Sequence, residues 1–180
     1  MKLTWFADTT LRIHIGGEIL VCDAANAPVF VDRRELVSGA DRLFTLSPDD
    51  SALPVADPVK WRPRVAPKVV DEPTTSLEVI VSRLGPGAVL IDAIGESPLL
   101  LLASGPTLRL GRWLNDAVVV LFGNGDAIVA AGSELLELAP PRLLVLASDE
   151  TSVDRAIADL RGRLEGTALV ALEPALALEV

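Results

Sequence analysis

The chain has 180 residues, of which 50% are hydrophobic and 4% aromatic, and its formal net charge is −9. This composition excludes a disordered chain, and the acidity argues against nucleic acid and anionic membranes as partners, because both attract a basic surface. The length predicts one domain over residues 1–180, and the single cysteine, Cys22, excludes an internal disulfide.

The N-terminal residues lack the long apolar stretch of a signal peptide. No run approaches the roughly eighteen apolar residues that a membrane span requires. We therefore expect a cytoplasmic protein that has no membrane partner.

Residues Leu3 to Asp23 are predicted to form two or three strands. Apolar residues from Leu11 to Ile15 alternate with polar ones, and Gly16-Gly17 predicts a hairpin turn, because primed turns need positive φ. The alternation places His14, the only histidine, on the solvent side of its strand. Cys22 follows two apolar residues and is predicted to be a buried strand thiol.

The next segments are predicted to be short strands and loops. Pro28 to Val31 and Arg42 to Leu46 are interpreted as strands, and Ser47 to Ser51 as a loop. Prolines recur through residues 54–73, a density that excludes helix and favours an extended surface segment.

The proline-rich segment contains Trp61, Arg62 and Arg64, and Trp113 follows later in a similar setting. Exposed Trp and Arg are favoured at protein interfaces, so these residues are candidates for contact with a protein partner or a second copy of the chain. The alternative is that the tryptophans pack onto their own domain.

Hairpins are predicted again in the middle of the chain. Gly85-Pro86-Gly87 joins two apolar runs, and Gly123-Asn124-Gly125-Asp126 is interpreted as a turn from Ala117–Phe122 into Ala127–Ala130. The second turn could also be a phosphate cradle, but no helix is predicted to follow it and the Gly-Lys-Ser/Thr ending of a P-loop is absent.

The C-terminal part changes to a helical period. Ser133–Ala139 is predicted to be a short helix and Leu143–Leu146 a buried strand. A helix over residues 153–164 follows, capped through Thr151 and Asp154, and Ala168–Leu172 returns as a strand. A long β-rich region followed by strand, helix and strand indicates an α/β layered sandwich.

This order of elements resembles the metallo-β-lactamase superfamily, particularly its lactonase-like, broad-range hydrolase branch. The resemblance rests on the residues from Met1 to Ile13, the Gly-Gly turn and the strand ending at Asp23. The predicted Ala117–Ala130 hairpin, the short helix, the run from Pro141 to Leu146 and the final helix fit the second half of the family. It implies a metallo-β-lactamase-like αββα sandwich, reduced in size and β-rich at its N-terminal end.

The residues that bind zinc in that family are missing. The family's His-x-His-x-Asp-His motif would align with Ser47, Asp49, Ser51 and Ala52, and its Gly-His pair with Ala7-Asp8. Its later ligands would fall near Ala103-Ser104 and near Ala147 or Ser148. Zinc prefers imidazole and thiolate, so the resemblance implies the fold without its metal. We expect no cofactor and partial filling of the vacated site by aliphatic residues such as Leu53.

Four carboxylates remain near these positions, and they are the candidate binding residues: Asp8, Asp23, Asp49 and Asp50. They could converge on an oxygen-liganded Mg²⁺ or Ca²⁺, or they could be turn and strand-end residues.

The sequence leaves two candidate functions. The preferred one is a non-catalytic binding or structural module with no catalytic residues, and it could form a homodimer. The alternative is a metal-dependent hydrolase with a carboxylate-based site.

Overall fold

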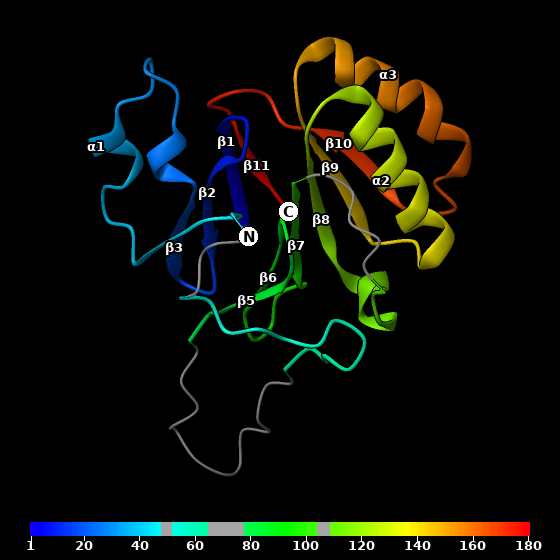
Figure 1. Cartoon of the computed structure of the whole chain (residues 1–180), viewed down its shortest axis with the longest axis horizontal. Helices are drawn as coiled ribbons and strands as arrows, with labels where there is room; N and C mark the ends of the chain where they lie inside the picture. The colour runs from blue at the N-terminus through cyan, green and yellow to red at the C-terminus, as the bar shows by residue number, and fades with distance from the viewer. Residues whose placement is uncertain (48–51, 65–77, 104–108) are drawn as a thin grey trace.

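Two β-sheets stack face to face in the computed structural model, which describes residues 1–47, 52–64, 78–103 and 109–180 (Figure 1). Sheet A has the strand order β11-β1-β2-β3-β4. Its strands are β1 (Lys2–Ala7), β2 (Thr10–Ile15), β3 (Glu18–Cys22), β4 (Arg42–Phe44) and β11 (Ala177–Glu179). All neighbours in this sheet are antiparallel except β3 and β4.

Sheet B has the order β10-β9-β8-β7-β6-β5. Its strands are β5 (Ile80–Gly85), β6 (Ala88–Asp92), β7 (Leu99–Ala103), β8 (Val118–Phe122), β9 (Leu143–Ala147) and β10 (Ala168–Ala171). The strands from β7 to β10 run parallel, and β5, β6 and β7 are antiparallel neighbours. The chain is therefore mixed α/β, with two mixed sheets.

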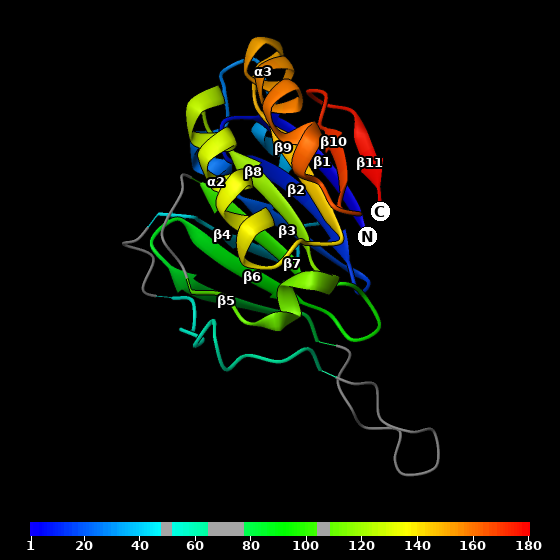
Figure 2. The same cartoon turned by 90° about the vertical axis from the view of Figure 1, so that its right-hand side faces the viewer.

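The helices cover the outer faces of the sheets. α2 (Gly125–Leu138) and α3 (Glu150–Leu160) lie across sheet B, with sheet A behind it in Figure 2. The short α1 (Arg33–Leu36) packs Leu36 near Val21, on the outer side of sheet A. Short 3₁₀ segments are η1 (Ala24–Asn26), η2 (Arg112–Asp116) and η3 (Arg161–Arg163). No helix in the described part of the chain is long and apolar enough to cross a bilayer.

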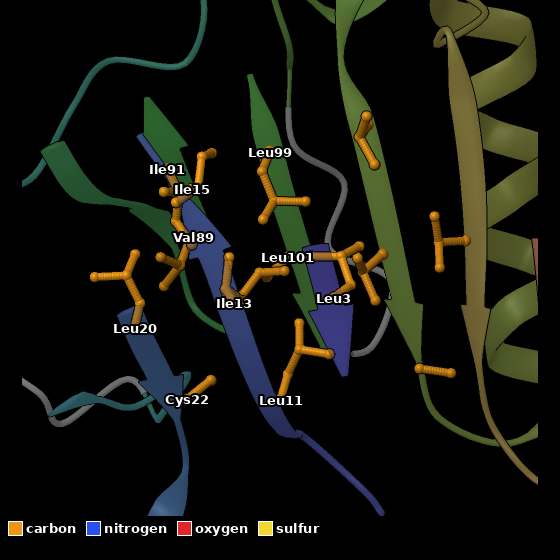
Figure 3. Close-up of a cluster of buried hydrophobic side chains, with 14 of the residues drawn as sticks. Leu3, Leu11, Ile13, Ile15, Leu20, Cys22, Val89, Ile91, Leu99 and Leu101 are labelled. Carbon is orange, nitrogen blue, oxygen red and sulfur yellow. The ribbon is translucent and has the colours of Figure 1, made fainter. Parts of the chain in front are cut away.

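Aliphatic side chains from both sheets meet in the main core (Figure 3). Leu3, Leu11 and Ile13 come from sheet A, while Leu99 and Leu101 come from sheet B, and all are fully buried. The opposite face of sheet B packs on α2 and α3, so its central strands are covered on both sides. This burial explains why their sequences are continuous apolar runs without alternation.

Several predicted elements are confirmed. The β2–β3 hairpin turns at Gly16 and Gly17, both with positive φ, and β5 and β6 pair across the Gly85–Gly87 turn. His14 is half-buried between two buried isoleucines, as the alternation predicted. Its pKa is lowered by desolvation and by the positive charges of Arg12 and Lys2. Residues 54–64 contain no helix, and residues 65–73 of the proline-rich segment lie outside the described residues.

Two predicted elements are wrong. Residues 28–31 form no strand but a turn, in which the amide of Val31 donates to the carbonyl of Pro28, and α1 follows because Asp32 caps it. The predicted hairpin after β8 is the start of α2: the Asn124 side chain accepts a hydrogen bond from the amide of Ala127 and caps the helix. Asp149, and not Thr151 with Asp154, caps α3.

Candidate functional site

A cavity of about 740 Å³ opens at one end of the molecule, where three parallel strands of sheet B finish. Ala103 ends β7, Phe122 ends β8 and Ala147 ends β9. The β1–β2 turn and the segment before β11 complete its wall (top of Figure 1). In α/β folds, ligands bind in the crevice outside the carboxyl ends of parallel strands, and this volume suits a small molecule.

The lining is mostly apolar. It consists of Trp5, Phe6, Ala7, Asp8, Thr9, Phe30, Ala103, Phe122, Gly123, Asn124, Ala147, Ser148, Asp149 and Pro174. Its aromatic residues come from three separate stretches of the chain. The cavity therefore has hydrophobic walls with a few polar groups at defined places, which is the usual composition of a ligand site.

The polar groups on the helix side are held by helix capping. The carboxylate of Asp149 accepts hydrogen bonds from the amide and the hydroxyl of Ser152, at 3.0 and 2.7 Å. The hydroxyl of Ser148 donates to the carbonyl of Gly123, at 2.5 Å, and so ties the loop after β9 to the loop after β8. The Ser152 hydroxyl and then its amide lower the pKa of Asp149, so this carboxyl is charged at neutral pH.

Replacing Asp149 by alanine should lower the melting temperature at pH 7, because the first turn of α3 loses its cap. The folded pKa of Asp149 lies below the ordinary 3.8, so its contribution is complete above pH 3.8 and fades as the pH falls through the folded value. Thermal unfolding of both proteins between pH 7 and pH 2 checks this prediction. A difference in melting temperature that stays constant over this range would contradict it.

The opposite wall is the β1–β2 turn. The indole N–H of Trp5 donates to the carbonyl of Asp8 at 2.9 Å and holds the turn, in which Asp8 adopts a φ of 44°. The carboxylate of Asp8 is exposed and has no hydrogen-bond or ion-pair partner among the described residues. It is therefore available to a ligand in the cavity.

The outer wall comes from the excursion between β3 and β4, which is the segment that contains η1 and α1. Phe30 lines the cavity although 77% of its surface is exposed. Arg12 of β2 anchors this excursion through hydrogen bonds to carbonyls at the end of α1, among them Ser38 at 2.8 Å. A hydrophobic side chain is thus held at the rim without being buried.

Asp23 does not reach this cavity. It is buried, and its carboxylate accepts hydrogen bonds from the hydroxyl of Thr45 and, at 3.4 Å, from the amide of Leu46. It lines a neighbouring cavity of about 410 Å³, which shares Thr9 and Ala103 with the first. These contacts give Asp23 a structural role at the end of β3.

Cys22 confirms the prediction of a buried strand thiol. Burial, then the charge of Asp23, raises the pKa of the Cys22 thiol, so it is a poor nucleophile at neutral pH.

The predicted carboxylate cluster is only partly described. Asp8 and Asp23 line different cavities, and Asp49 and Asp50 lie outside the described residues. Within the described ranges, no three His, Cys, Asp or Glu side chains are grouped so that they could hold a metal ion.

The candidate interface residues make contacts within the chain. Trp61 and Trp113 stack edge to face with ring centroids 5.0 Å apart, and the indole N–H of Trp113 donates to the carbonyl of Pro58. Arg64 pairs with Asp92, whereas Arg62 is exposed and donates to the nearby carbonyls of Val59 and Trp61. The packing alternative thus accounts for the tryptophans, and a role in partner binding stays a prediction.

Some site residues could not be singled out from the sequence. Trp5, Phe122 and Asp149 line the cavity, but in the sequence they look like ordinary core and capping residues. The one available signal was Gly123-Asn124-Gly125 after a buried strand, which also fits a helix start. Leu53, expected to fill the vacated site, lines a different cavity beside β4 and β5.

Comparison of the chain with protein-family models, with curated proteins and with solved structures finds no match. The assignment of a function therefore depends on the cavity itself.

Proposed function

We propose that this chain is a metallo-β-lactamase-like domain that has lost metal-dependent hydrolysis and binds a small apolar ligand in the cavity at the ends of β7, β8 and β9. The order of the layers supports the proposed fold. α1, sheet A, sheet B and then α2 with α3 are stacked in the order of an αββα sandwich.

One observation carries the proposal. Two positions near which the resemblance would place metal ligands, Ala103 and Ala147–Ser148, line one cavity together with Asp8, which aligns with the family's Gly-His pair, although the three are far apart in sequence. Alanine and serine there supply no imidazole or thiolate, and aromatic side chains surround them. A cavity at these positions without zinc-binding side chains supports binding without hydrolysis, which is the function proposed.

The test is calorimetric titration of the whole chain with 2-(1-naphthyl)ethanol, a neutral probe with an apolar body. We expect saturable binding, and we expect Ala103→Trp to weaken it by about tenfold or more, because the indole would occupy the cavity. Ala130→Trp is the matched control, since Ala130 is an exposed residue of α2. Phe30→Ala, at an exposed position, should weaken binding without a change in melting temperature.

Absence of binding at millimolar probe, or equal affinities for the two tryptophan variants, would overturn the proposal. Elemental analysis of protein purified without chelator provides the second arm. A stoichiometric metal that is lost together with the carboxylate of Asp8 or Asp49 would favour the hydrolase alternative.

A further inference from the structure

The cavity has aromatic walls, and the charged side chains on its described lining are acidic. Its aromatic residues are Trp5, Phe6, Phe30 and Phe122, which together with Pro174 can enclose the body of an apolar molecule. Aromatic faces also attract organic cations, because the ring quadrupole presents negative charge on its face. The walls therefore suit either a neutral ligand or a cationic one.

The charged residues on the lining favour the cationic ligand over the neutral one. Asp8 and Asp149 are the charged side chains on the lining, and no Lys, Arg or His lines the cavity in the described part of the chain. The carboxylate of Asp8 is free of protein partners there, and that of Asp149 is exposed as well as bonded to Ser152. A ligand with a positive group in this cavity would meet acidic side chains on the lining and no basic side chain among the described residues that form it.

An anionic ligand is the main competitor, because the N-termini of α2 and α3 both face this end of sheet B and helix N-termini attract anions. Here, however, the first turns are already acidic. Asp149 caps α3 and Glu150 follows it, while the side-chain oxygen of Asn124 caps α2 and Asp126 lies in the first turn of that helix. Asp126 is ion-paired with Arg155 at 2.6 Å, so the carboxylates of Asp149 and Glu150 are the ones that would repel a phosphate or a carboxylate.

We infer that the cavity selects a small hydrophobic amine, with its apolar body between Trp5, Phe30 and Phe122 and its ammonium group at Asp8 and Asp149. The inference rests on the proposed function, since it names the ligand class of that same cavity. It needs no covalent step and no cofactor.

The test is a matched series that shares one apolar body: 2-(1-naphthyl)ethylamine, 2-(1-naphthyl)ethanol and 1-naphthaleneacetate, titrated at pH 7 and low salt. We expect the amine to bind about tenfold more tightly than the alcohol, and the carboxylate to bind most weakly. The preference for the amine should shrink as the salt concentration rises, because ions screen charges at an open site.

The variant Asp8→Asn/Asp149→Asn removes both charges. It keeps the left-handed turn, which Asn tolerates, and the helix cap, which Asn also makes. We expect its affinity for the amine to fall to that for the alcohol, with the affinity for the alcohol unchanged. The control Asp154→Asn/Asp159→Asn makes the same change in net charge on exposed positions of α3 and should leave the preference intact. Asp8→Asn alone serves if the double variant does not fold.

The outcomes separate the two proposals. Equal affinities for amine and alcohol, or tighter binding of the carboxylate, would overturn the amine inference and leave the binding function standing. A preference for the amine that survives in the double variant would overturn its assignment to Asp8 and Asp149. No binding by any member of the series would overturn the proposed function itself.

Discussion

Replacing Arg64 by methionine is expected to lower the free energy of unfolding by about 3 kcal/mol, because it leaves a buried carboxylate without its partner. The Nε of Arg64 lies 2.5 Å from the carboxylate of Asp92, whose side chain is 4% exposed. Arg64 also donates to the main-chain carbonyls of Glu78 and Asp92, at 2.8 and 2.7 Å. It therefore ties the segment before residue 65 to the end of β6 and to the residues just before β5.

Urea denaturation monitored by circular dichroism measures this loss, with Arg62→Met as the control, because Arg62 is exposed. The double variant Arg64→Met/Asp92→Leu should regain part of the stability, since it also removes the buried carboxylate that Arg64→Met leaves unpaired. Equal stabilities of the Arg64 and Arg62 variants would show that the ion pair contributes nothing.

Replacing Leu101 by alanine is expected to cost about 3 kcal/mol, through lost burial and the space left between the sheets. Leu101 lies on β7, between Val89 of β6 and Val120 of β8, and is fully buried in the core that joins sheets A and B (Figure 3). Because β7 also ends at the cavity, the variant should bind the naphthyl probe more weakly.

Leu176→Ala is the matched control, since Leu176 is 58% exposed and should change stability by less than about 0.5 kcal/mol. Denaturant titrations of the two variants check the prediction. A cost at Leu101 no larger than at Leu176 would contradict the packing of sheet A on sheet B.

The sequence predicts the β2–β3 and β5–β6 hairpins well, because their signals are local. Gly16 and Gly17 both need positive φ, and their φ values are 58° and 83°. The buried runs of sheet B are also apparent, since residues such as Leu99 to Leu102 are apolar without alternation. These runs do not show which strands are neighbours in the sheet, or whether two neighbouring strands are parallel or antiparallel.

That missing information explains the error after β8. Gly123-Asn124-Gly125 is compatible with a hairpin turn and with a helix start, and both are locally favourable. β8 lies between β7 and β9 and parallel to both, so the chain must cross over before it returns to the sheet. A helix makes this crossover, and two-residue turns cannot.

The candidate site was predictable only in part for the same reason. Asp8 can be singled out because it follows a strand and aligns with the family's Gly-His pair. Phe30 and Pro174 reach the cavity from an excursion and from the segment before β11, so only the tertiary structure unites them. Nothing in the sequence marks Asp149 as a ligand-binding residue, since its position is that of a helix N-cap for α3.

The most direct test of the binding site is an amide chemical-shift map of the ¹⁵N-labelled chain titrated with 2-(1-naphthyl)ethanol. The largest shifts should fall on the amides of Asp8, Gly123 and Asp149, which surround the cavity. Shifts confined to exposed apolar residues elsewhere, such as Leu43 or Val55, would contradict a ligand site at the ends of β7, β8 and β9.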